Sequence, residues 1–276
     1  MLRYFTCLIY LLAVSLSACS EGHSPPAKRT PSFGFSTFGM MSTEFLKILP
    51  ELLSLNISKV ALLWRSFGEH PASLDLWLKT EGQKTVEIHM LNGAGRRNQR
   101  LGESDLFPYM GINEFNHAIE YRTHDIEIRL WIAEIARFAM ERPGVNWILS
   151  LGLESNYTPL AAMRLLQLVV DEWPYEIAYN PIDPNDCDYM PNSVYCETHS
   201  IPTTAKHLRC IVNNDGIDFS SKEEALDFIE RNKHCIVFLW SGETQGVSNP
   251  FIPTLEREFK FDNVNFFKEI LNEGSN

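Results

Sequence analysis

Residues 147–156 read Trp-Ile-Leu-Ser-Leu-Gly-Leu-Glu-Ser-Asn, in which large apolar residues alternate with mostly smaller or polar ones. A period of two predicts a β-strand with one apolar face, here formed by Trp147, Leu149, Leu151 and Leu153. The other face ends at Glu154. We therefore expect this strand to carry a carboxylate at its carboxyl end.

Helical patterns flank this strand on both sides, over residues 125–142 and 158–173. A helix on each side of a strand is typical of βαβ units, in which the strands pair in parallel. In parallel sheets and barrels, chemistry lies just past the carboxyl ends of the strands. The position of Glu154 is therefore that of a candidate functional residue.

The same alternation of strand and helix continues along the chain and predicts eight strands. Their expected ranges are 32–39, 59–67, 84–92, 147–156, 175–181, 193–200, 208–215 and 234–242. Helices are expected over 43–55, 71–79, 125–142, 158–173, 220–231 and 263–271. Eight such strands over about 240 residues match a (β/α)8 TIM barrel, a fold of about 250 residues. A doubly wound open sheet is the alternative, but no Gly-x-Gly-x-x-Gly turn follows the first strand.

The composition fits one globular domain. The chain has 276 residues, of which 45% are hydrophobic and 21% charged, which allows a sizeable core. The formal net charge of −11 argues against a nucleic-acid partner, because phosphates require a basic surface. No phosphate-binding loop and no Gly-x-Ser-x-Gly element is present in the sequence.

The amino-terminal segment has the features of an export signal. Arg3 precedes the apolar run 8–16, which is too short for a confident membrane span. Residues 16–19, Leu-Ser-Ala-Cys, resemble the bacterial lipobox, and the resemblance implies cleavage before Cys19 and lipidation of its thiol. We expect a signal peptide at 1–18, a tether at 19–31, a single barrel domain at 32–276, and an exported lipoprotein of the outer membrane or cell surface.

Four cysteines follow the tether, and an exported chain permits disulfides. Cys187 and Cys196 are expected to pair, because the loop between them is short and turn-forming. Cys210 and Cys235 would begin neighbouring strands and could pair or be buried. A zinc site is the alternative, although no Cys-x-x-Cys or His-x-x-x-His spacing supports it.

Polar residues and a tryptophan follow or end most predicted strands. They are Arg65, His89, Asn92, Glu154, Asn156, Asn180, Glu197, His199, Asn213, Asn214, Asp215, Trp240 and Glu243. Carboxylates, amides and imidazoles bind hydroxyl groups, and an indole stacks on the apolar face of a sugar ring. The set is suited to a polysaccharide or oligosaccharide substrate.

The pattern resembles the clan A glycoside hydrolases, most nearly family 5. The likeness consists of an arginine at strand two, the strand-three sequence from Glu87 to Gly95, a glutamate at strand four, a histidine at strand six and a tryptophan at strand eight. It departs at Leu153, where the family has Asn, and at strand seven, where only Asp215 could replace the family's Glu. The resemblance implies a TIM-barrel glycosidase that needs no cofactor.

Glycosidases require two carboxyl groups that flank the scissile bond. Glu154 is the expected acid/base. For the second carboxylate, Asp215 ranks first by the resemblance, Glu197 next by its place on the sixth strand, and Glu243 after it. Structural roles for these carboxylates, such as a Glu154 ion pair with an arginine, stay open.

Further binding residues are expected around the same end of the barrel. The residues expected to bind or orient the substrate are Arg65, His89, Asn92, Asn180, His199, Trp240 and Glu243. Arg96 and Arg97 could bind an anionic sugar group, or could be a solvated loop that pairs with neighbouring acids.

Two other function classes stay open. One is a barrel without catalysis that binds glycans at the surface. The other is a metal-dependent hydrolase in which His89, His199 and a carboxylate such as Glu154 or Glu197 would converge on one ion, although a buried structural histidine is the commoner outcome.

Overall fold

The computed structural model describes residues 33–36, 49–50, 52–54, 56–64, 72–91, 110–198, 209–214 and 222–240. The predicted signal peptide, the predicted tether with Cys19 and the predicted helix at 263–271 lie outside these residues. Within them, no helix is both long and apolar enough to cross a membrane.

Eight strands form a closed parallel barrel, paired in chain order from β1 to β8. The strands are β1 (Phe33–Ser36), β2 (Lys59–Leu63), β3 (Lys84–His89), β4 (Val145–Ser150), β5 (Glu176–Tyr179), β6 (Tyr195–Thr198), β7 (Cys210–Asn214) and β8 (Ile236–Trp240). Pairing of β8 with β1 closes the barrel, with Phe33 opposite Val237. The prediction of a (β/α)8 TIM barrel is confirmed, and the open sheet is wrong.

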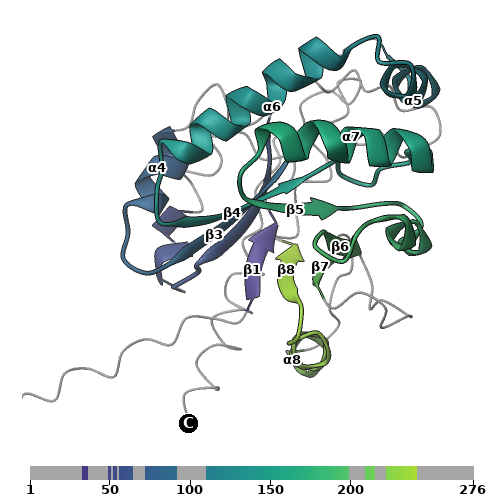
Figure 1. Ribbon diagram of the computed structural model, residues 1–276. Coiled ribbons are helices and arrows are strands. Elements are labelled where there is room, and N and C mark those ends of the chain that lie inside the picture. Colours follow the sequence, from purple (N-terminus) through teal and green to yellow (C-terminus); the bar gives the residue numbers. More distant parts are fainter. Residues whose placement is uncertain are drawn as a thin grey trace, which may run out of the picture.

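The described helices are α4 (Ala72–Leu78), α5 (Ile112–Glu120), α6 (Asp125–Met140), α7 (Pro159–Glu172), the short 3-10 helix η2 (Pro184–Tyr189) and α8 (Lys222–Arg231). In Figure 1, α6 and α7 lie side by side over β3, β4 and β5. The start of α7 is specified locally, because the Thr158 side chain accepts from the Ala161 amide and Pro159 occupies the first helical position. Thr158 therefore caps the helix that the sequence predicts.

The strand that begins near Trp147 is shorter than its alternation predicts. β4 ends at Ser150, so Glu154 lies on the connection that follows the strand. The side chain of Leu153 belongs to the apolar cluster inside the barrel, whereas that of Leu149 packs outside. The prediction that Leu153 shares the face of Leu149 is therefore wrong, because the backbone leaves the sheet after Ser150.

Between β3 and α6 the structure has a helix, α5, that the sequence pattern does not predict. α5 begins after Gly111, whose amide donates to Glu114 Oε2 at 2.9 Å. Phe115 and Ile119 are buried on its inner side. The helix packs against α7, and Phe115 lies 5.6 Å from Tyr157 between ring centroids.

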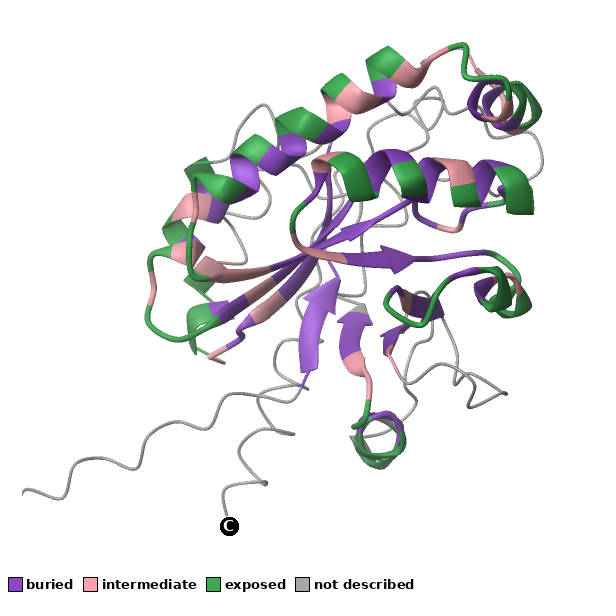
Figure 2. Ribbon diagram, viewed as in Figure 1, coloured by how far each residue is buried: buried purple, intermediate pink, exposed green. Residues whose placement is uncertain are grey.

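Two separate apolar groups form the core. The larger lies between strands and helices and includes Trp64, Trp77, Trp147 and Leu149. The smaller fills the barrel and consists of Ala61, Leu63, Ile148, Leu153, Ala178, Ile211 and Phe238. Figure 2 shows the resulting pattern, with buried strands and helices that are buried only on their inner sides. Side chains of adjacent residues along a strand thus pack into different apolar groups.

Both disulfides form on the same side of the barrel. Cys187 pairs with Cys196, as predicted, and Cys210 pairs with Cys235, which resolves the choice left open by the sequence. Cys196 and Cys210 are register partners on β6 and β7. The two bonds therefore connect η2 to β6, and β7 to the residue that precedes β8.

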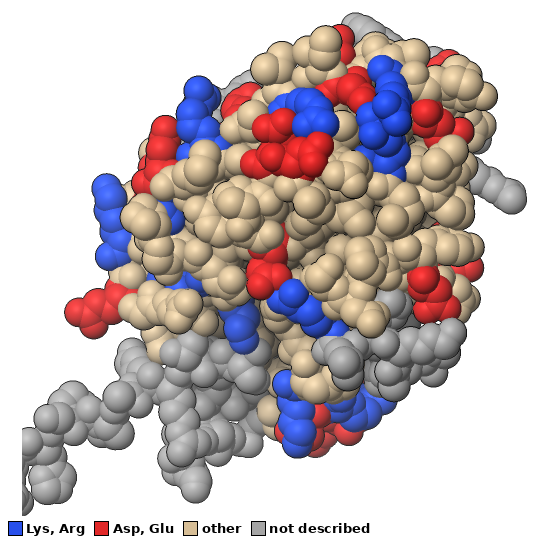
Figure 3. Space-filling view, viewed as in Figure 1, with Lys and Arg blue, Asp and Glu red and all other residues tan. Residues whose placement is uncertain are grey.

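The face shown in Figure 3 carries basic and acidic side chains close to one another. Arg129 on α6 contacts both Asp171 and Glu172 on α7, at 2.6 and 2.8 Å. Arg164 also pairs with Asp125 between these helices. These ion pairs link α6 to α7. Each contributes little to the free energy of folding, because exposed ion pairs are weak.

Candidate functional site

A layer of polar side chains lies inside the barrel near the carboxyl ends of five consecutive strands. It consists of His89, Ser150, Asn180, Glu197 and Asn213, all 0% exposed. His89 and Ser150 end their strands and are register partners. Because these side chains lie at or next to the carboxyl ends of their strands, the layer lies at the end of the barrel where parallel strands place binding sites.

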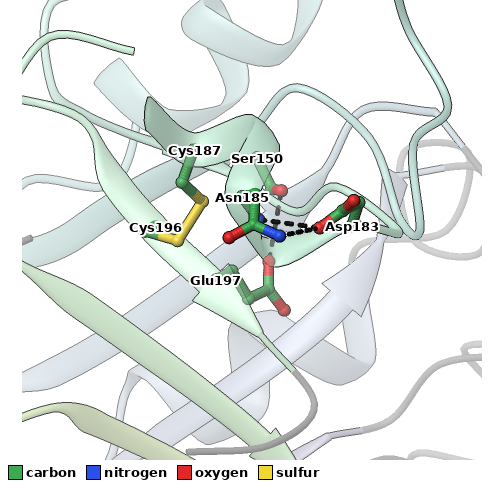
Figure 4. Close-up of a disulfide and its surroundings, with 6 residues drawn as sticks. All are labelled: Ser150, Asp183, Asn185, Cys187, Cys196 and Glu197. Carbon is green, nitrogen blue, oxygen red and sulfur yellow. Dashed lines mark hydrogen bonds between the residues drawn. A yellow bond between two sulfur atoms is a disulfide. The ribbon is translucent and has the colours of Figure 1, made fainter. Parts of the chain in front are cut away.

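Glu197 is the centre of this layer. Ser150 Oγ donates to its Oε2 at 3.3 Å, and Asn213 Nδ2 donates to its Oε1, also at 3.3 Å. His89 Nε2 lies 3.5 Å from the same Oε1. In Figure 4 the carboxyl group of Glu197 lies beside Ser150. Three strands, β3, β4 and β7, thus bring polar groups to the carboxyl group that β6 carries.

Glu87 lies two residues before His89 on the same face of β3 and is also 0% exposed. Its Oε1 is 3.7 Å from His89 Nε2. Burial raises the pKa of Glu87 to about 8, an effect partly opposed by its interaction with Glu197. Burial and the neighbouring Glu87 carboxylate also raise the pKa of Glu197, while His89 opposes the rise. The pair is therefore hard to ionise without a compensating positive charge.

Glu154 lies on the connection after β4, with a left-handed backbone conformation at φ 48°. Few residues other than glycine adopt this region, and such conformations persist where the surroundings hold them. The Glu154 amide donates to Asn180 Oδ1 at 3.3 Å, and the Ser155 amide donates to the Asn180 carbonyl at 2.7 Å. The Glu154 side chain is partly exposed.

Ser155 extends this link to the next connection. It forms a parallel bridge with Pro181, and its carbonyl accepts from the Ile182 amide at 3.0 Å. The segment that follows β4 is therefore tied to the segment that follows β5. Glu154 is held at the carboxyl end of the barrel, as predicted, although four residues beyond the strand.

The structure brings three residues with a predicted site role into the polar layer, namely His89, Asn180 and Glu197, together with Asn213, which the sequence also places at a strand end. Trp240 ends β8, where its backbone is opposite Ser36 of β1. The remaining predicted site residues lie outside the described residues. They are Arg65, Asn92, Arg96, Arg97, His199, Asp215 and Glu243.

Two members of the cluster are not marked as site residues by the sequence. Ser150 is a small residue in an apolar alternation, and Glu87 lies in the middle of a strand and not at its end. The available signal is the spacing of Glu87 and His89, which places two titratable groups on one face of a buried strand. Two titratable groups on the same face of a strand that is buried from Val86 to His89 indicate an interior polar site.

No family model and no curated protein matches the chain. Among solved structures, a similar one is the crystal structure of the glycoside hydrolase family 30 subfamily 8 xylanase Xyn30A from Clostridium acetobutylicum, with a TM-score of 0.46 and 9% sequence identity. The similarity covers 79% of this chain and 66% of that chain, slightly less than two thirds of its length.

Proposed function

We propose that the protein is a glycoside hydrolase in which Glu154 is the proton donor. The observation that carries this proposal is the place of Glu154 at the carboxyl end of the barrel, in a left-handed conformation held by Asn180. A glutamate whose backbone is held at this end, on the connection after β4, is suited to protonate a leaving oxygen.

Hydrolysis also requires a second carboxylate. Asp215, which follows β7, is our first choice for this residue. Glu197 is less suited to act as a nucleophile, because its burial beside Glu87 raises its pKa and a nucleophile must be ionised. Glu197 and His89 would instead lie beneath the substrate-binding site, inside the barrel.

We further propose that the chain is anchored to a bacterial membrane through Cys19 and acts on an envelope or extracellular polysaccharide. The support is the Leu-Ser-Ala-Cys sequence at 16–19 with the apolar run before it. Mass spectrometry of the mature amino terminus, with the Cys19→Ala variant as comparison, tests the lipid anchor directly.

The test of catalysis is release of reducing sugar from a panel of envelope and plant polysaccharides by the full chain in mild detergent. Glu154→Gln keeps the shape of the side chain but cannot donate a proton, so we expect activity to fall by about 10²- to 10⁴-fold. The matched control is Glu134→Gln, since Glu134 is exposed on α6 and far from the barrel end. Equal activity of wild type and Glu154→Gln contradicts the assignment.

Glycan binding without hydrolysis is the second candidate function. The departures at Leu153 and in strand seven from the glycosidase pattern favour it. Isothermal titration of the same polysaccharides separates the two functions, because binding without release of reducing sugar supports the second.

A further inference from the structure

The polar cluster inside the barrel contains more hydrogen-bond acceptors than donors. Glu87 and Glu197 contribute four carboxyl oxygens. Among the described residues, the side chains of Ser150 and Asn213 donate hydrogen bonds to these oxygens, and both bonds are to Glu197. Neither oxygen of Glu87 has such a bond to a described residue. Because buried carboxylates need compensation, a cation bound among these oxygens would stabilise the ionised cluster.

The spacing of the possible ligand atoms fits a metal ion. One nitrogen of His89 and one oxygen from each of Glu87 and Glu197 lie within 4.8 Å of one another. The Nε2 atom of His89 is 3.5 Å from Glu197 and 3.7 Å from Glu87. Ligands bound at 2.0–2.2 Å in a tetrahedron lie about 3.3–3.6 Å apart, so small side-chain shifts complete the site.

A fourth group lies beside these three. Asn213 is 0% exposed, and its Oδ1 has no hydrogen-bond partner among the described residues. Its Nδ2 already contacts Glu197, so the carboxamide lies at the edge of the cluster. Rotation of the amide by 180° would turn the oxygen toward the carboxyl pair. An oxygen there is repelled by carboxylates but is a good ligand for a cation.

We propose that Glu87, His89 and Glu197 bind one divalent metal ion inside the barrel, with Asn213 Oδ1 as a further ligand. One imidazole with two carboxylates and an amide oxygen is a ligand set suited to zinc or manganese. The ion would neutralise both carboxylates. None of the ligands is Glu154 or Asp215, so metal binding and hydrolysis can be measured separately.

The test is metal content and affinity of the untagged full chain in mild detergent. The chain is first treated with a chelator and then dialysed against Zn²⁺ or Mn²⁺. Bound metal is then measured by inductively coupled plasma mass spectrometry. We expect about one ion per chain, and an affinity at least about tenfold weaker for Glu87→Gln and for His89→Gln, because each loses a direct ligand.

Two controls separate this site from other binding. His117→Gln removes an exposed histidine on α5 and should bind metal like the wild type. Glu154→Gln should also bind normally, so a failed glycosidase assay and a failed metal assay are distinguishable. Equal metal binding by wild type, Glu87→Gln and His89→Gln, or no binding by the wild type, overturns the proposal and indicates that the carboxyl pair shares a proton.

Discussion

Cys196 and Glu197 are neighbours on β6, and their side chains point to opposite faces of the barrel wall. Cys196 forms a disulfide with Cys187 of η2 in the outer core, whereas Glu197 meets Ser150 and Asn213 in the interior. Figure 4 shows the disulfide together with the Glu197 carboxyl group. The disulfide therefore holds the strand that carries the central carboxyl group of the polar layer.

Removal of this disulfide should lower stability. We expect Cys187→Ala with Cys196→Ala to decrease the free energy of unfolding by about 2–3 kcal/mol, because the unfolded chain regains the entropy of a short loop. The cysteines are nine residues apart, whereas Cys210 and Cys235 are 25 apart. Urea denaturation should therefore show a loss at least as large for the second pair, about 3–4 kcal/mol. An unchanged midpoint for both double variants contradicts the prediction.

Gly152 should not tolerate a side chain. A Cβ at this position would lie 2.6 Å from the Tyr157 hydroxyl and 2.7 Å from Ser155 Oγ. Tyr157 cannot easily move, because it is buried and its hydroxyl donates to the Leu151 carbonyl at 3.1 Å. We expect Gly152→Ala to lower the free energy of unfolding by about 1–3 kcal/mol.

The Tyr157→Phe variant provides the matching test of this contact. Alone it should cost about 1 kcal/mol, because it removes one buried hydrogen bond. In the double variant with Gly152→Ala, the loss of the hydroxyl relieves part of the clash, so the combined effect should be smaller than the sum of the single effects. Additive values in thermal or urea unfolding would show that Tyr157 is not the obstacle.

Asn180 should act as a positioning residue for Glu154. Its Oδ1 accepts from the Glu154 amide, and the side chain is 0% exposed. If the proposed glycosidase function holds, we expect Asn180→Ala to lower kcat by about tenfold to a hundredfold, since small displacements of a catalytic group are costly. KM should change less. Asn185→Ala, which removes an exposed amide bonded to Asp183, is the control.

Amide hydrogen exchange gives a second measurement that does not depend on activity. The Glu154 amide should exchange faster in Asn180→Ala than in the wild type, because its acceptor is lost. Unchanged exchange together with unchanged kcat would remove Asn180 from this role.

Arg142 should stabilise the fold more than an exposed arginine does. It forms two bonds to Asp75, at 2.6 and 3.2 Å, donates to the Phe138 carbonyl at 2.8 Å and lies over the Phe138 ring. Its side chain is 17% exposed, compared with 52% for Arg231, which pairs with Asp227 on α8. We expect Arg142→Ala to cost about 1–2 kcal/mol and Arg231→Ala about 0.5 kcal/mol or less. Similar denaturation midpoints for the two variants would contradict this difference.

Local patterns in the sequence were sufficient to predict the barrel. Alternation within strands such as 84–89, and helices such as 158–173 with their caps, recur along the chain, and parallel strands joined by helices have few possible arrangements. The pairing of Cys187 with Cys196 was predictable for the same reason, because the loop between them is short. These features depend on residues close together in the chain.

The composition of the interior site was decided by the tertiary structure. Glu87, Ser150, Glu197 and Asn213 lie on four strands, and their contacts depend on the register and closure of the barrel. The end of β4 at Ser150 likewise depends on contacts between its following segment and Asn180. The sequence of a single strand shows which of its residues share a face. Which side chains of other strands contact that face is determined by the barrel, because strand pairing and burial are long-range.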